Sequence, residues 1–226
     1  MSGKSDVQLA EDPKITHPVD PSLPFFLSHD AVHATKNLRN NLLRPKANFW
    51  TEKGCITWGL LRELHRVDST STLKMAPGLT PLVVDPVGFN RQKVSLALTA
   101  IGHRTRNALR WYAQQDPVRF PPADVDATLE YFENAHEFFT ILNVNHPRKG
   151  AFKSCQDPRL QKLLSLKTYF EGLPLGILTS ETRPVVIQIC NASVQIISYL
   201  LQNHVSSVLT ARFNQDKLEE YALRHN

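Results

Sequence analysis

The chain has 226 residues, of which 42% are hydrophobic, so it can bury the core of one large domain or of two small ones. Its formal net charge of +5 is compatible with phosphate-bearing partners but does not require them. The three cysteines, Cys55, Cys155 and Cys190, lie far apart and form no CxxC pair, which argues against a zinc ribbon and against a disulfide framework.

The segment after Met1, "SGKSDVQLAEDPK", lacks the apolar stretch of a signal peptide. No apolar run approaches the roughly 18 residues that a membrane span needs. The sequence therefore predicts no signal peptide, no transmembrane segment and a nuclear or cytoplasmic location.

The pattern of the first 68 residues predicts a polar lead-in followed by a strand, an aspartate and a helix. Residues 1–22 are rich in Pro and Asp, which predicts an extended lead-in. The apolar run in "LPFFLSHD" predicts a buried strand that ends at Asp30. In "AVHATKNLRNNLL" the apolar residues recur every three or four positions, as in a helix that packs on a sheet. A second short strand over "NFWTEKGCIT" and an amphipathic helix over "WGLLRELHRV" follow.

From Phe89 onward, strand signals nearly vanish and long helical patterns appear. They are "FNRQKVSLALTAIGHRTRNALRWYAQQ", "PPADVDATLEYFENAHEFFTILN", "DPRLQKLLSLKTYFEG" and "RPVVIQICNASVQIISYLLQN". Pro158 and Pro184 stand where a first helical residue is expected. The last pattern, "FNQDKLEEYALRHN", predicts a short helix with Asn214 as its cap and acids in its first turn. Together these patterns predict a helical bundle.

The order of the acids is that of an RNase H-like nuclease core, in which carboxylates from distant segments hold two Mg²⁺ ions about 3.5–4 Å apart. Asp30 follows a predicted strand, and Asp216 and Glu219 lie three residues apart on one face of a predicted helix. The same spacing is typical of the solvated first turn of an ordinary terminal helix. The residues alone leave both interpretations open.

Several segments resemble those of one transposase family. "FFLSHDAVHATKNLRNNLL" resembles the "fDppHllKnirNNl" segment of P element and THAP-type transposases, and "LTARFNQDKLEEY" is similar to their "LtsrlNQDpLEnfF". Between them, "ITWGLLRELHRVD", "LKMAPGLT", "FNRQKVSLALTAIGHRTRNAL" and "EFFTILN" follow the family's order. The resemblance covers roughly residues 15–225.

The resemblance implies a mainly α fold, in which a helical insertion-domain bundle that binds GTP is flanked by a small, incomplete RNase H-like α/β remnant. The bounds expected from it are an extended lead-in over 1–22, an RNase H-like strand–helix remnant over 23–68, the all-helical insertion domain over 69–205 and the start of a catalytic helix over 206–226.

The resemblance also implies the site residues. It makes Asp30 and Glu219 catalytic ligands of Mg²⁺ for DNA strand cleavage and transfer, and Lys36 and Arg39 either DNA-phosphate contacts or solvated charges. The residues expected to contact GTP are Lys93, Val94, Asn143 and Asp216.

Two positions depart from the family's GTP pattern. Gly78 stands where the pattern has lysine, which removes a phosphate contact, and Thr140 stands where an aspartate reads guanine. A threonine cannot accept the two N–H bonds that an aspartate accepts, so the sequence predicts weak or lost GTP binding. Val94 also begins an apolar stripe with Leu96, Leu98 and Ile101, which favours bundle core over nucleotide pocket.

The family's first catalytic aspartate and its THAP zinc finger have no counterpart in this sequence. We therefore expect a fragment or decayed copy of a P-element-type transposase that is inactive alone, with transposon-end DNA and other transposase chains as the family's partners. One alternative is completion of the active site by another chain. The other is a domesticated helical interaction module that binds protein or DNA without catalysis, through its basic residues Arg104, Arg106, Arg110, Arg148, Lys149 and Lys153.

Overall fold

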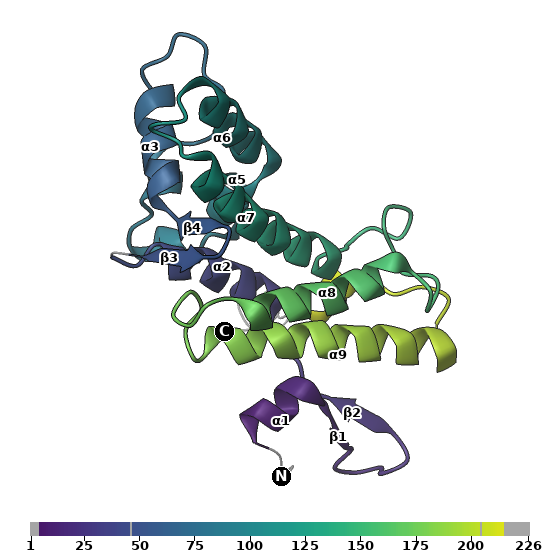
Figure 1. Cartoon of the computed structure of the whole chain (residues 1–226). Helices are drawn as coiled ribbons and strands as arrows, with labels where there is room; N and C mark the ends of the chain where they lie inside the picture. The colour runs from purple at the N-terminus through teal and green to yellow at the C-terminus, as the bar shows by residue number, and fades with distance from the viewer. Residues whose placement is uncertain (1–4, 46, 204, 215–226) are drawn as a thin grey trace. The chain divides into compact units, whose positions relative to one another are not determined.

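The computed structural model describes residues 5–45, 47–203 and 205–214, and they are mainly helical, as predicted (Figure 1). The chain divides into two compact units, each built from separated stretches. The terminal unit comprises Met1–Ala34, Phe138–Gly172 and Ser180–Asn226, and the central unit comprises Thr35–Glu137 and Leu173–Thr179.

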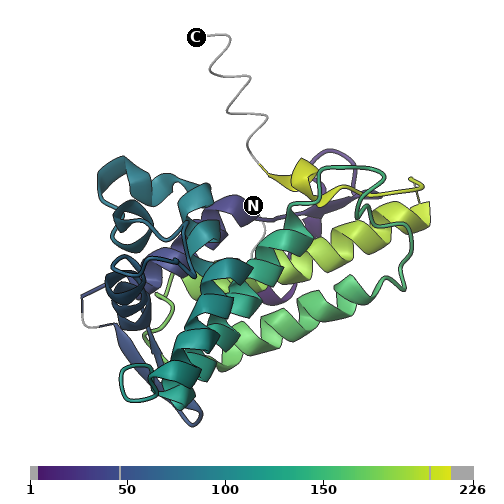
Figure 2. The same ribbon diagram turned by 90° about the horizontal axis from the view of Figure 1, so that it is seen from above.

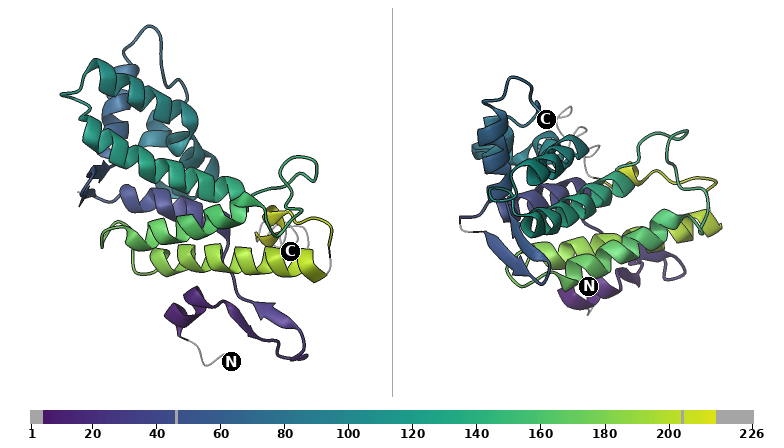
Figure 3. Two further views of the ribbon diagram at one scale, coloured as in Figure 1. Left: turned by 45° about the vertical axis from the view of Figure 1, so that its right-hand side comes forward. Right: turned by 45° about the horizontal axis from the view of Figure 1, so that its top comes forward.

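Two long helices form the body of the terminal unit. α8 (Pro158–Gly172) lies beside α9 (Thr182–Asn203), and α1 (Asp6–Glu11) packs on α9 (Figures 1 and 3). The rings of Phe138 and Phe170 meet edge to face with their centroids 6.0 Å apart, and both are fully buried. Burial of such large apolar side chains is the main favourable term in folding, so this contact marks the core of the unit.

The expected extended lead-in over residues 1–22 is wrong, because this stretch contains a helix and a strand. Ser5 and Gln8 form a reciprocal capping box that begins α1, a signal the sequence carries as "SDVQ". β1 (Lys14–Thr16) then pairs antiparallel with β2 (Pro24–Phe26), as the hairpin in Figure 2 shows. β2 is also shorter than the predicted strand and ends four residues before Asp30.

α9 is more apolar than expected, because the sequence predicted no apolar run as long as a membrane span. Over 18 of its residues the mean hydropathy reaches 1.5, so by length and composition it could cross a membrane. However, half of that window is buried inside the protein, and the buried Asn191 side chain donates to the Ala10 carbonyl oxygen at 2.6 Å. This packing is that of a core helix. The helix begins at Thr182 rather than at Pro184.

The central unit contains the larger share of the elements. They are most of α2 (Ala31–Leu42), β3 (Asn48–Thr51), β4 (Gly54–Thr57), α3 (Gly59–Asp68), α4 (Pro81–Val84), the 3₁₀ helix η1 (Gly88–Gln92), α5 (Val94–Ile101), α6 (His103–Gln115) and most of α7 (Pro122–Leu142). Trp58 anchors the core: it is fully buried, its ring meets Phe132 edge to face, and its indole N–H donates to the Val84 carbonyl oxygen at 2.7 Å.

Two expectations for this unit need correction. The single strand expected over residues 48–57 is an antiparallel hairpin of β3 and β4, turned at Gly54, whose φ of 147° favours glycine. A Cβ at Gly54 would lie 2.3 Å from the Ala123 carbonyl oxygen, so glycine is also needed for this close approach. The single helix expected from Phe89 to Gln115 is divided into η1, α5 and α6.

We predict that Asn191→Ala lowers the free energy of unfolding by about 1–3 kcal/mol, because the buried Ala10 carbonyl oxygen then loses its donor. Urea denaturation followed by circular dichroism measures the change. Asn203→Ala is the matched control, since its amide bonds Tyr199 on the exposed face of the same helix. Equal changes in the two variants would contradict the proposed role of the α1–α9 contact.

Candidate functional site

Asp30 lies in the terminal unit and caps the first turn of α2. It is buried, and its Oδ1 accepts a hydrogen bond from the backbone N–H of His33 at 2.9 Å, as an N-cap aspartate does. Its predicted partner, Glu219, lies outside the described residues. Within residues 5–45, 47–203 and 205–214, no three histidine, cysteine, aspartate or glutamate side chains converge as metal ligands. The described residues thus supply a single member of the predicted metal site.

Asn143 follows the end of α7 in the terminal unit. Its side-chain oxygen accepts from the amide of Asn214 at 3.1 Å, and the neighbouring Val144 N–H donates to the Thr210 hydroxyl. These bonds fasten the 3₁₀ helix η2 (Thr210–Phe213) beside Asn143. The predicted GTP contact Asp216 comes two residues after Asn214, outside the described residues. The Asn214 amide thus pairs with Asn143, and the terminal helix that Asn214 was expected to cap lies outside the described residues.

Lys93 and Val94 belong to the central unit. Lys93 is exposed and occupies the N-cap position of α5, where its side chain makes no capping bond. Val94 is half-buried, and so are Leu96 and Leu98, whereas Ala97, Ala100 and Ile101 form the buried face of the helix. Most of the expected apolar stripe therefore lies at the margin of the core.

A cavity of about 260 Å³ lies in the central unit where α5 meets α6. It combines an apolar floor with two basic residues, His103 and Arg104, that are exposed in the first turn of α6. Gly78, where the family pattern has lysine, also contributes to the wall. The lining residues are Ala76, Gly78, Leu79, Leu98, Thr99, Gly102, His103, Arg104 and Thr105.

Gly102 makes this cavity by separating α5 from α6. Its backbone is extended, with φ −71° and ψ 164°, and a Cβ there would lie 2.6 Å from the Leu98 carbonyl oxygen. Because real Cβ atoms do not approach an oxygen so closely, the break requires glycine. The Thr105 hydroxyl donates to the Thr99 carbonyl oxygen at 2.8 Å and fixes the junction.

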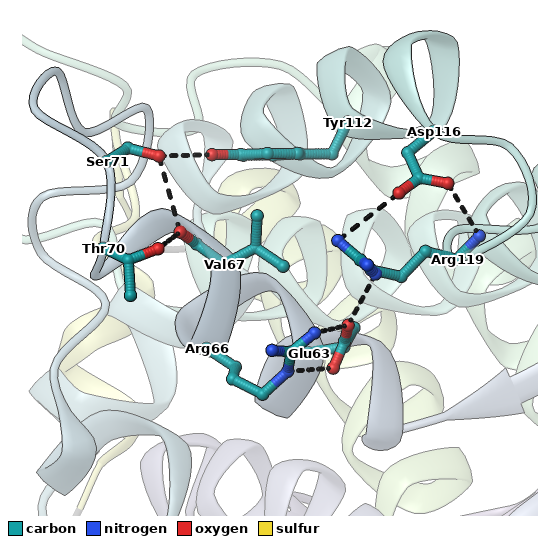
Figure 4. Close-up of polar contacts among 8 residues, drawn as sticks. All are labelled: Glu63, Arg66, Val67, Thr70, Ser71, Tyr112, Asp116 and Arg119. Carbon is teal, nitrogen blue, oxygen red and sulfur yellow. Dashed lines mark hydrogen bonds and ion pairs between the residues drawn. The ribbon is translucent and has the colours of Figure 1, made fainter.

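Asp68 fixes the loop that contributes Ala76 to the wall of the cavity. Its buried carboxylate accepts hydrogen bonds from the N–H groups of Met75 and Ala76, at 2.7 and 3.0 Å, and from the Tyr112 hydroxyl at 3.1 Å. Figure 4 shows the Tyr112 hydroxyl pointing at Ser71 in the same loop. A buried carboxylate with three donors is well compensated, so the loop is positioned by it.

Ion pairs surround this anchor on α3 and α6. In Figure 4, Arg119 lies between Glu63 and Asp116, and Arg66 binds Glu63 with two bonds. The hydrogen bond from Arg66, followed by the charges of Arg66 and Arg119, holds the pKa of Glu63 below its ordinary value. These are partly exposed pairs, which contribute little to stability individually.

Cations also gather on the α6–α7 side of the central unit. Arg106 and Arg110 both pair with Glu133, so two of the expected basic surface residues share a single negative charge. Burial, and then the charges of Arg106 and His103, lower the pKa of His136. Arg104 has no acidic partner among the described ion pairs, which leaves its charge for the cavity.

Comparison with known protein families gives one match, which covers residues 32–155, more than half of the chain. The matching model describes the TNP-like GTP-binding insertion domain. The chain belongs to this TNP-like family. The match includes every residue that lines the cavity, together with Lys93, Val94 and Asn143, while Asp30 precedes it and Asp216 and Glu219 follow it. The resemblance to this family expected from the sequence is confirmed.

Among solved structures, this TNP-like chain is similar to the Drosophila P element transposase in its strand transfer complex. The TM-score is 0.73 at 16% identity, and the alignment covers 94% of this chain and 49% of the other. At that identity the likeness shows the shared fold alone, and the TNP-like chain spans about half the length of that transposase. No match was found among curated proteins.

The cavity wall of the TNP-like domain gives a direct prediction. Asp68→Ala should lower the free energy of unfolding by about 2–4 kcal/mol, because two buried N–H groups and the Tyr112 hydroxyl lose a charged acceptor. Asp85→Ala, which removes an exposed ion pair with Arg62, should cost about 1 kcal/mol or less. Chemical denaturation of both variants checks the difference, and similar losses would show that Asp68 is no special anchor.

Proposed function

We propose that this chain carries the GTP-binding insertion domain of a P-element-type DNA transposase, and that the cavity at the α5–α6 junction takes part of the nucleotide. The observation that carries this proposal is the overlap between the match to a GTP-binding domain family and that cavity. The similarity of fold to the Drosophila P element transposase supports it.

The chemistry of the cavity suits a nucleotide phosphate better than a neutral ligand. The first turn of α6 presents backbone N–H groups, and the helix dipole makes that end positive. Arg104 adds a side-chain cation there, and His103 adds an imidazole ring. A phosphate at this point would meet the helix end and the Arg104 charge, and Leu79 and Leu98 would contact the apolar part of the ligand.

Weak affinity follows from the two departures in the family pattern. Gly78 offers no ammonium group to a phosphate, and Thr140 offers no carboxylate to guanine. Each lost charge-assisted hydrogen bond of about 1.5–3 kcal/mol weakens binding by roughly tenfold to a few hundredfold. We therefore propose that GTP binds weakly, so that a transposase carrying this domain would respond only to high nucleotide levels.

Thr140→Asp should tighten GTP binding about tenfold or more and leave ATP binding unchanged, because only guanine presents two adjacent N–H donors to a carboxylate. Isothermal titration calorimetry measures both affinities. Thr168→Asp, an exposed threonine on α8 of the same unit, is the charge-matched control.

The same titration series includes a loss variant. Arg104→Ala should weaken GTP binding further, whereas Arg62→Ala on the exposed surface should not. If the original chain and Thr140→Asp both fail to bind GTP at millimolar concentration, the nucleotide proposal is wrong. The better-supported function would then be that of a helical interaction module that binds protein or DNA, since Arg148, Lys149 and Lys153 are exposed.

We further propose DNA as the partner, with Asp30 and Glu219 as ligands of a catalytic Mg²⁺. The order of these acids along the sequence and the likeness to a transposase in a strand transfer complex support this proposal. One described carboxylate does not by itself make a two-metal centre, and we expect activity only when further carboxylates complete the set.

Calorimetric titration with Mn²⁺, a mimic of Mg²⁺, tests the metal ligands. Asp30→Asn and Glu219→Gln should each weaken metal binding about tenfold to a hundredfold, because each removes a charged ligand. Glu220→Gln, one residue further along the chain, should leave binding unchanged. If Glu219→Gln and Glu220→Gln behave alike, Glu219 is not a ligand.

A further inference from the structure

Arg39 is a buried cation that lacks an acidic partner in the described part of the chain. Only 1% of its surface is exposed, although arginine is among the residues least often buried without a partner. Its Nη2 donates to the Arg91 carbonyl oxygen at 2.8 Å. Its Nε and Nη1 are buried and have no hydrogen-bond partner among the described residues. Three N–H groups of a charged guanidinium are thus without an acceptor.

The positive charge of Arg91 increases the imbalance at Arg39. Burial, and then the positive charge of Arg91, lower the pKa of Arg39 to about 10. Since that value is far above neutrality, the side chain stays protonated. Isolated burial of a charge is among the most unfavourable arrangements in a folded protein unless a counter-charge is present. The arrangement therefore calls for an anion.

The side chain of Asn40 adds a polar atom without a described hydrogen-bond partner beside Arg39. Its Nδ2 reaches the same Arg91 carbonyl oxygen at 3.4 Å, so the Asn40 and Arg39 side chains converge on one atom. Its Oδ1 is buried and has no partner among the described residues. Arg39 and Asn40 therefore leave several N–H donors and one acceptor without described partners beside Arg91, whose own Nε donates to the Pro86 carbonyl oxygen at 3.2 Å, all within the central unit.

We propose that Arg39, Asn40 and Arg91 form a binding site for one phosphoryl group, between α2 and η1. A phosphoryl group presents several oxygens to the guanidinium forks. Inorganic phosphate in its HPO₄²⁻ form carries two negative charges, which balance two cations, and one O–H group, which can donate to Asn40 Oδ1. Arg91 is exposed, so the ligand enters on its side.

The source of the phosphoryl group is a separate question from its binding. Inorganic phosphate, the phosphate of a nucleotide and a phosphate of the DNA backbone all present unesterified oxygens to a guanidinium, although the DNA phosphodiester carries a single negative charge and no O–H group. The proposal does not depend on the GTP function, because inorganic phosphate alone is the first probe. GTP and a short DNA duplex are the second and third probes.

The test is calorimetric titration of the full chain with sodium phosphate, with sodium chloride at equal ionic strength as the reference. Arg39→Met keeps the length and apolar stem of the side chain and removes the charge, so phosphate binding should fall about tenfold to a hundredfold. Arg62→Met is the matched control, because Arg62 is exposed and paired with Asp85, and it should bind phosphate as the original chain does.

Two further measurements keep the proposal open to refutation. Arg39→Lys keeps the charge, and so preserves folding if Arg39→Met does not, but it loses the fork and should still weaken phosphate binding about tenfold. The absence of phosphate binding by the original chain, or an equal loss in Arg62→Met, overturns the proposal. If GTP or duplex DNA displaces phosphate, the displacing ligand is the source of the phosphoryl group. If phosphate binds and neither GTP nor DNA displaces it, the site binds the free ion.

Discussion

The central unit depends on how one buried carboxylate is satisfied. Asp68 ends α3, and its two oxygens together bind Met75 and Ala76, in the loop that leads to α4, and a tyrosine on α6. The end of α3, this loop and α6 are thereby held at one point. The wall of the cavity is the segment that this carboxylate fixes, so the position of Gly78 and Leu79 follows from a residue that does not line the cavity itself.

Much of the helical content was predictable because apolar periodicity is a local property. α2, α3, α7 and α8 begin and end near the residues expected from their patterns. The errors arose where the decisive interaction is either very short or tertiary. The capping box at Ser5 occupies four residues, and the break at Gly102 depends on the approach of the Leu98 carbonyl oxygen, which no periodicity reveals.

The candidate site was predictable only in part. Gly78 was singled out from the family pattern, and it does line the cavity, whereas the roles of His103 and Gly102 were missed because they arise from the α5–α6 junction. Lys36 and Arg39, read as exposed phosphate contacts or solvated charges, are buried. A helical pattern indicates which residues share a face, but it does not indicate how deeply that face is covered.

The break at Gly102 has an energetic consequence for the domain. It places the Arg104 cation at the positive end of α6, where the helix dipole repels a cation, and no side chain caps that end. The first turn of α6 is therefore electrostatically frustrated in the free protein. Any anion that settles there relieves the frustration, so occupancy of the cavity and the stability of α6 are linked thermodynamically. The ligand would act as the missing cap of the helix.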